Sequence, residues 1–244
     1  MPSKKLRIFA GPNGSGKSSL FDEFSKSFST GYFLNADRIE HDFVEKGYFD
    51  ITETGISSDE ITFNSFLSTS GLFEKAKSEG FKINLQIKNN IVVNLSKESN
   101  SYEAALLTSF LRNNLIKEGK SFSFETVMSD PSKLIEIKEA NDLGYSSYLY
   151  FIATESPLIN KSRILERVLK GGHNVRPDKI EKRYYKTLDN LYTAIQLSYR
   201  AYIFDNSGGE IKLLAEFFRG KGKHYHGKSY PLWFNKYVIQ KIDF

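Results

Sequence analysis

A glycine-rich stretch near the start of the chain has the residue types and spacing of a phosphate-binding loop. Residues 11–18 read G-P-N-G-S-G-K-S and match the pattern G-x-x-x-x-G-K-S. Glycines at these positions let backbone N–H groups converge on phosphate oxygens. Lys17 can reach the β- and γ-phosphates of a nucleotide, and Ser18 can supply a Mg²⁺ ligand. ATP and Mg²⁺ are therefore the expected cofactors, bound by Gly11, Pro12, Asn13, Gly14, Ser15, Gly16, Lys17, Ser18 and Ser19.

The segments on either side of this loop have the secondary structure that a phosphate loop requires. Lys5 to Ala10 is an apolar strand candidate, and residues 18–28 carry apolar side chains at helical spacing. A strand, a glycine-rich turn and a helix in that order define the P-loop context. The stretch does not fit G-x-G-x-x-G, so a nicotinamide-dependent dehydrogenase is disfavoured.

Two acidic residues follow predicted strands, where α/β proteins bind ligands. Asp37 comes after the strand candidate 32–35, and its carboxylate can accept a proton from a substrate hydroxyl. Glu125 ends the strand candidate 121–125 and can orient that hydroxyl or hold a water on Mg²⁺. The alternative for each is a helix N-cap, since acidic side chains often cap the helix that follows them.

Cationic side chains gather in the second half of the chain. A guanidinium near the transferred phosphoryl group can neutralise its developing charge, although most arginines are simply solvated surface residues. His224 and His226 have metal-ligand spacing, but no third ligand is evident and an exposed basic loop is the preferred interpretation. The arginine candidates on or between two predicted helices are Arg163, Arg167, Arg176 and Arg183.

The alternation of strands and helices predicts an α/β fold of the P-loop NTPase type, with a mostly parallel sheet and helices on both faces. Residues 82–96 alternate in polarity around Asn89-Asn90, which predicts a β-hairpin. A hairpin is foreign to a purely parallel sheet, so residues 51–99 are interpreted as an insertion. The predicted organisation is one kinase domain over 1–244, with a C-terminal extension at 210–244.

Composition excludes several classes of protein. The 244 residues contain 40% hydrophobic and 26% charged residues and no Cys, which rules out disulfide frameworks and thiol catalysis. No apolar run is long enough for a membrane helix, so a soluble cytoplasmic protein is expected. Residues 161–244 carry 17 basic and 8 acidic side chains, which suits a polyphosphate ligand. A nucleic-acid partner is disfavoured because no known nucleic-acid-binding signature is present.

Six motifs together resemble the zeta-toxin-like P-loop kinases, particularly their shorter bacterial branch. The resemblance covers about residues 10–50 and 101–207, and leaves out the hairpin segment and the tail. The motifs are A-G-P-N-G-S-G-K-S (10–18), N-A-D-R-I (35–39), S-F-E-T (123–126), R-V-x-x-G-G-H (167–173), P-x-x-I-x-x-R-Y (177–184) and F-D-N-S (204–207).

The resemblance implies ATP- and Mg²⁺-dependent phosphorylation of a hydroxyl on a small molecule. In the best-known members the acceptor is a UDP-amino sugar, and a small helical antitoxin blocks the nucleotide site. Matched by position, Lys17 binds phosphate, Asp37 is the base, and Glu125 with Thr126 contacts the substrate. Arg167 matches the family's first catalytic arginine, and either Arg183 or His173 stands for the second.

Three functions fit these residues. The first is a metabolite kinase that phosphorylates a nucleotide sugar such as UDP-N-acetylglucosamine, or a related nucleotide, and acts as a toxin or a housekeeping enzyme. The second is a P-loop ATPase that switches a macromolecular partner and releases free phosphate. The third is a polynucleotide-end kinase, which would explain the basic C-terminal third and predicts salt-sensitive binding. The kinase of small molecules is preferred.

Overall fold

The computed structural model describes residues 4–96, 100–171, 175–227 and 229–242. The chain forms two compact units, one of residues 1–33 with 121–244, the other of residues 34–120. The first unit contains the glycine-rich loop and the second contains the predicted hairpin. That residues 1–244 form a single kinase domain, with residues 51–99 as an insertion in it, stays a prediction.

A seven-stranded sheet forms the centre of the first unit, in the order β10-β9-β8-β7-β1-β6-β2. The pairs β1–β6, β1–β7 and β7–β8 are parallel, whereas β9 and β10 are added antiparallel at one edge. The mostly parallel sheet predicted from the sequence is thereby confirmed. The strands are β1 (Lys5–Ala10), β2 (Tyr32–Leu34), β6 (Phe122–Thr126), β7 (Ser146–Ala153), β8 (Arg200–Asp205), β9 (Lys212–Phe218) and β10 (Lys221–Tyr225).

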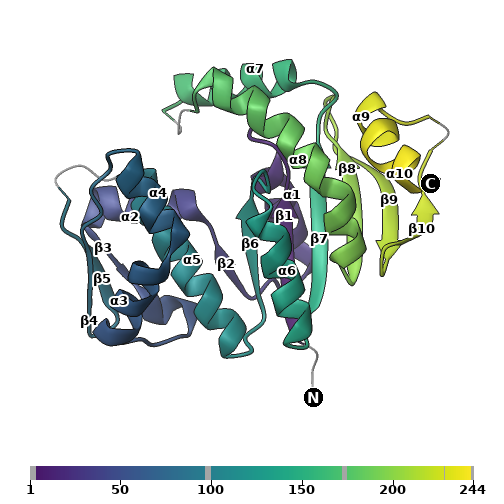
Figure 1. Cartoon of the computed structure of the whole chain (residues 1–244). Coiled ribbons are helices and arrows are strands. Elements are labelled where there is room, and N and C mark those ends of the chain that lie inside the picture. The colour runs from purple at the N-terminus through teal and green to yellow at the C-terminus, as the bar shows by residue number, and fades with distance from the viewer. Residues whose placement is uncertain (1–3, 97–99, 172–174, 228, 243–244) are drawn as a thin grey trace. The chain divides into compact units, whose positions relative to one another are not determined.

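Helices cover both faces of this sheet, as the sequence predicts. On one face, Phe21 and Phe24 of α1 contact Phe9 edge to face, with ring centroids 5.1 and 5.7 Å apart. On the other face, Phe151 contacts Trp233, and α6 and α8 lie in front of the sheet in Figure 1. The helices are α1 (Lys17–Ser27), α6 (Ser132–Asp142), α7 (Pro157–Leu169), α8 (Pro177–Leu197), α9 (Leu232–Phe234), the π-helical turn η2 (Asn235–Ile239) and α10 (Gln240–Ile242).

The second unit packs helices against one face of a small antiparallel sheet, in the order β3-β5-β4. Asn89 and Asn90 take positive φ angles of 51° and 65° at the β4–β5 turn, which confirms the predicted hairpin. Phe63 and Phe110 meet edge to face in the core. The elements are α2 (Ala36–Lys46), β3 (Tyr48–Asp50), the 3₁₀ helix η1 (Ile51–Thr54), α3 (Glu60–Thr69), α4 (Gly71–Ser78), β4 (Leu85–Lys88), β5 (Ile91–Asn94) and α5 (Ser101–Lys117).

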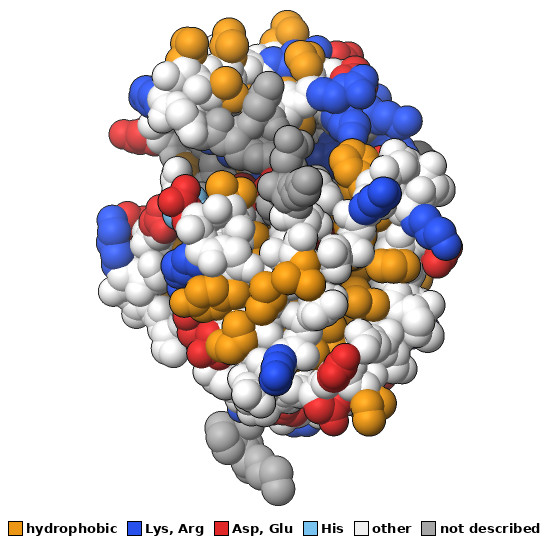
Figure 2. Space-filling view, turned by 90° about the vertical axis from the view of Figure 1, so that its left-hand side faces the viewer, with side chains coloured by type: hydrophobic (Ala, Val, Ile, Leu, Met, Phe, Trp, Pro, Cys, Tyr) orange, Lys and Arg blue, Asp and Glu red, His pale blue; other side chains and the backbone are white. Residues whose placement is uncertain are grey.

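The outer face of this small sheet has an apolar part, beside Asp50, Gln86 and Lys88 on the same face. The β3–β5 register places Tyr48 opposite Val93, and Ile91 lies on the same face. These three residues line a depression of about 480 Å³ together with Lys46, and Figure 2 shows hydrophobic side chains gathered on this side of the unit. Within the part of the chain that the structure describes, no helix is long and apolar enough to cross a membrane.

Candidate nucleotide-binding site

The loop between β1 and α1 has the backbone of a phosphate cradle. Gly14 and Gly16 lie in the left-handed region, with φ angles of 77° and 101°. A Cβ atom added to Gly11 would lie 2.0 Å from the carbonyl oxygen of Ile152, so the loop and β7 approach too closely for any side chain. The Gly11 N–H also donates to the carbonyl oxygen of Thr126, 3.3 Å away, which ties the loop to the end of β6.

Lys17, Ser18 and Glu125 meet where β1 and β6 end. Lys17 is 6% exposed, and its Nζ donates to the carbonyl oxygen of Pro12 at 3.1 Å. The same ammonium lies 3.5 Å from Glu125 Oε1, while Ser18 Oγ donates to Glu125 Oε2 at 3.0 Å. A sheltered cation, a hydroxyl and a carboxylate therefore share one small volume beside the loop.

The residues of this cluster fit ATP and Mg²⁺. Ser15 Oγ and Asn13 Oδ1 are buried and have no hydrogen-bond partner among the described residues. A buried polar atom without a partner is costly, so these two atoms indicate a ligand that the loop is built to meet. Hydroxyl and carboxylate oxygens, as in Ser18 and Glu125, are the donors that Mg²⁺ prefers.

Two asparagines that the sequence analysis did not select hold the loop in shape. Asn160 of α7 is fully buried, and its Nδ2 donates to the carbonyl oxygen of Asn13 at 2.7 Å. Its Oδ1 accepts from the hydroxyl of Thr154. Asn206 Nδ2 donates to the carbonyl oxygen of Ser15 at 2.8 Å. Asn206 belongs to the F-D-N-S motif, but nothing in the sequence around Asn160 marks it.

Replacing Asn160 should loosen the loop. We expect Asn160→Ala to lower the free energy of unfolding by about 1–3 kcal/mol, because the carbonyl of Asn13 loses its hydrogen bond and the Thr154 hydroxyl keeps only the carbonyl of Ser156 as acceptor. ATP affinity should fall about tenfold, an effect of about 1.4 kcal/mol, since the carbonyl of Asn13 is no longer held. Chemical denaturation and calorimetric titration with ATP measure the two effects.

Asn141→Ala is the matched control, because Asn141 Nδ2 donates to the carbonyl oxygen of Leu197 at 2.7 Å in a different part of the unit. This variant should lose stability but keep its ATP affinity. Equal ATP affinity in Asn160→Ala and the wild type would show that Asn160 has a structural role only.

The C-terminal segment is tied to the loops that follow β7 and β8. The N–H of Leu232 donates to both carboxylate oxygens of Glu155, at 3.1 Å each. Trp233 Nε1 donates to Asp205 Oδ1 at 3.0 Å, and Ser207 Oγ donates to the same oxygen at 2.7 Å. Trp233 is 3% exposed and belongs to the core. Asp205 therefore anchors the tail.

The pH dependence of stability should report this anchor. Burial raises the pKa of Glu155 above its ordinary value of 4.5, against the lowering effect of the Leu232 N–H. The folded protein thus binds a proton more readily than the unfolded chain, and its stability rises as pH falls toward 4.5. As the pH is lowered from 7 to 5, we expect the urea midpoint of the wild type to rise relative to the urea midpoint of Glu155→Gln. A constant difference would contradict this.

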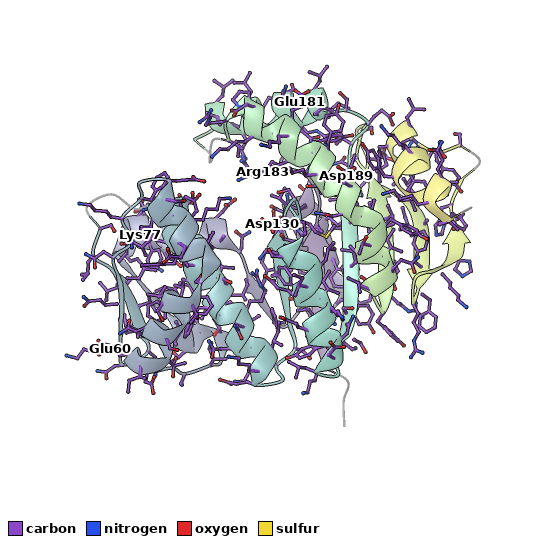
Figure 3. The ribbon with its side chains drawn as sticks, in the orientation of Figure 1. Glu60, Lys77, Asp130, Glu181, Arg183 and Asp189 are labelled. Carbon is purple, nitrogen blue, oxygen red and sulfur yellow. The ribbon has the colours of Figure 1, made fainter. Side chains whose placement is uncertain are left out.

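The arginine candidates separate in the structure. Arg167 is exposed in the last turn of α7, and Arg183 is half-buried on α8. In Figure 3, Glu181 lies on the side of α8 toward α7, where its carboxylate is 2.6 Å from Lys161 Nζ, and Arg183 lies on the other side of the helix. Arg176 is exposed and pairs with Asp178 at 3.1 Å. His173 lies outside the described residues.

Arg163, one of the four arginine candidates, contacts the loop that follows β8. Its Nη2 donates to the carbonyl oxygen of Gly208 at 3.2 Å, in the loop after β8. Its Nη1 is buried and has no hydrogen-bond partner among the described residues. Asn206 lies in the same loop after β8, two residues before Gly208, and donates to the phosphate loop. Arg163 is therefore connected to the candidate site through the loop after β8.

The helix-cap alternatives for the two acidic residues are wrong. Asn35 caps α2, because its Oδ1 accepts from the N–H of Asp37 at 2.8 Å. Asp37 lies in the first turn of α2, in the second unit, with an exposed side chain. Before α6 it is Asp130 whose carboxylate accepts from the N–H of Ser132, at 3.0 Å, and Glu125 faces Lys17 instead.

The remaining candidates have ordinary surroundings. Thr126 Oγ1 accepts from the N–H of Met128 at 3.1 Å, and Ser19 is exposed in the first turn of α1. His226 Nε2 lies 3.3 Å from Glu216 Oε1, and His224 is exposed on β10. Among the described residues, no group of three or more His, Asp or Glu side chains could hold a metal ion.

Solved structures share this fold at low sequence identity. A chain of the crystal structure of AvrRxo1-ORF1:AvrRxo1-ORF2 with sulphate ions matches 91% of this chain at 14% identity and a TM-score of 0.54. The native complex gives 13% identity and a TM-score of 0.52. The PezAT toxin–antitoxin system of Streptococcus pneumoniae gives 13% identity over 88% of this chain and 71% of the other, with a TM-score of 0.47.

This chain spans 60% of the length of the matched AvrRxo1 chains. Comparison of the sequence with protein-family models finds no match, and comparison with curated proteins finds none either. The sheet order, the glycine-rich loop after β1 and the AvrRxo1 matches together show a P-loop kinase fold. This agrees with the resemblance to the zeta-toxin-like P-loop kinases that the motifs indicated.

Proposed function

We propose that this protein is an ATP- and Mg²⁺-dependent kinase that transfers the γ-phosphate to a hydroxyl group of a small molecule. The acceptor we propose is a nucleotide sugar such as UDP-N-acetylglucosamine, or a related nucleotide. The observation that carries the proposal is the convergence of Lys17, Ser18 and Glu125 beside a loop with two unpartnered buried polar atoms.

Each residue has a role in this proposal. Lys17 and the backbone N–H groups of the loop bind the phosphates, and Ser18 with Glu125 would hold Mg²⁺, which neutralises phosphate charge when bound. Asp37 accepts the proton of the acceptor hydroxyl. Its carboxylate is exposed and does not serve as the N-cap of α2, which supports that role. Arg167 and Arg183 stabilise the transferred charge, with Arg163 as a further candidate.

The biological role that we propose rests on the resemblance to the zeta-toxin-like P-loop kinases. We propose that the protein acts in the cytoplasm as a toxin and that a small helical antitoxin blocks its nucleotide site. The AvrRxo1 structures with which the fold was compared contain two proteins, as their names state.

The test of the proposal is product analysis. The purified protein is incubated with Mg²⁺, ATP labelled with heavy oxygen in its γ-phosphate, and UDP-N-acetylglucosamine or a pool of cell metabolites. Mass spectrometry should find one labelled phosphoryl group on a metabolite, and the labelled group should be absent when ADP replaces ATP. Label found only in free phosphate would overturn the kinase and favour the partner-switching ATPase.

A further inference from the structure

The strand register of the first unit builds a row of side chains across five strands. Arg7 on β1 is opposite Tyr148 on β7, which is opposite Arg200 on β8. Arg200 is opposite Phe218 on β9, which is opposite Lys221 on β10. Directly opposite residues point to the same face of a sheet. The row therefore reads cation, aromatic, cation, aromatic, cation, and we call it the cross-sheet row.

The cross-sheet row lies on the α1 face and stays accessible. The next row toward the phosphate loop contains Phe9 and Tyr150, which stack on each other and contact Phe24 of α1. Phe9 is fully buried and Tyr150 is 7% exposed. All five members of the cross-sheet row are partly or fully exposed. α1 thus covers the row near the loop. The cross-sheet row beside it is partly accessible, although Tyr148 also packs against the buried cluster around Phe9 and Tyr150.

Contacts between rings and cations hold the side chains of the row in place. The guanidinium of Arg200 lies 5.7 Å from the ring centroid of Phe218. Tyr199 joins Tyr148 and Phe218 edge to face, with centroids 5.7 and 5.2 Å apart. The guanidinium of Arg219 lies 5.5 Å from the ring of Phe218. Rings and cations that support one another lose little freedom when a further flat group stacks on them.

The charge of this face selects the partner. Lys5 shares the face with Arg7, since the two are separated by one residue on β1, and Arg219 is exposed at the β9–β10 turn. On the described strands of this face the register places two acidic residues, Glu216 in β9 and Glu125 in β6. Glu216 already faces His226, and Glu125 already faces Lys17 near the phosphate loop. Strands are spaced about 4.8 Å apart, so successive cations of the row are separated by roughly 10 Å with a ring between them.

We propose that the cross-sheet row binds single-stranded nucleic acid. The bases would stack on Tyr148 and Phe218, and the phosphates would meet Arg7, Arg200 and Lys221. Stacking of bases on aromatic side chains of a sheet, beside a positively charged track, is one way in which proteins bind single strands. The basic residues of the C-terminal third thereby gain a role away from the phosphate loop. This surface is separate from the proposed kinase site and needs neither ATP nor Mg²⁺.

The experiment measures binding of a fluorescein-labelled uridine 12-mer by fluorescence anisotropy, in the absence of ATP and Mg²⁺. We expect binding at 50 mM salt with a log–log salt slope near −2, because single strands give about −0.7 per neutralised phosphate and three cations take part. Arg7→Gln should reduce the slope by about 0.7. Phe218→Leu keeps the apolar bulk but removes the stacking ring, and should weaken binding about 5- to 100-fold.

Lys138→Gln and Tyr185→Leu are the matched controls. Lys138 is exposed on α6 and Tyr185 is 45% exposed on α8, so each removes the same kind of group outside the row. Both should bind the 12-mer like the wild type. Absence of binding at 50 mM salt would overturn the proposal. Equal binding by Phe218→Leu, or equal loss in the controls, would also overturn it, because either would mean non-specific attraction to any polyanion. Anionic vesicles of phosphatidylserine that bind more tightly than the 12-mer would reassign the row to membranes.

Discussion

Lys17→Gln should reduce phosphoryl transfer by roughly 10²–10³-fold, the loss that follows removal of one preorganised donor from a charged transition state. The wild-type ammonium is 6% exposed and lies 3.5 Å from the Glu125 carboxylate. In this sheltered position its charge acts through a lower effective dielectric than at the surface, so a neutral amide cannot replace it. The measurement is kcat with saturating acceptor, or the rate of ADP release before the acceptor is known.

The variant should remain folded, because Glu125 keeps the hydrogen bond from Ser18 Oγ at 3.0 Å. Lys26→Gln is the matched control on the same helix. Lys26 is 68% exposed and pairs with Glu23 at 2.7 Å, a surface contact worth little. A loss of activity in Lys26→Gln as large as in Lys17→Gln, or none in Lys17→Gln, would remove Lys17 from the catalytic residues.

Much of the structure of the candidate nucleotide site was predictable because it is local in the sequence. Gly11 to Ser18 are consecutive, and the strand before them and the helix after them follow from polarity alone. The hairpin was predictable for the same reason, because the two adjacent residues Asn89 and Asn90 determine its two-residue turn.

The parts that were not predicted depend on contacts between distant residues. Asn160 is 147 positions from Asn13 in the sequence, and no local pattern predicts that its side-chain amide donates to the carbonyl oxygen of Asn13. The cross-sheet row is assembled from five strands, and Arg7 and Lys221 are joined only by the register of all four pairings between them. The contacts of the C-terminal extension are not predictable from local sequence either, because Glu155 and Asp205, which bind Leu232 and Trp233, are far away along the chain.

Asp37→Asn should lower phosphorylation of the acceptor by about 10²–10⁴-fold, the usual contribution of a general base. Asn35 continues to cap α2 in this variant, because the cap accepts from the backbone N–H of residue 37 and not from its side chain. Stability should therefore stay within about 0.5 kcal/mol of the wild type, as for other surface substitutions. ATP affinity should also be unchanged, since the loop proposed to bind the phosphates belongs to the first unit and Asp37 to the second.

The comparison that isolates the base is with Glu45→Gln, which neutralises another exposed carboxylate on α2. Glu45→Gln should phosphorylate the acceptor at the wild-type rate. If Asp37→Asn lost ATP affinity as well as rate, Asp37 would act in nucleotide binding; if it kept the full rate, the base would be another residue. A rate loss confined to Asp37→Asn, with ATP affinity intact, is the result that a proton acceptor requires, because the acceptor's proton leaves only when its oxygen attacks phosphorus.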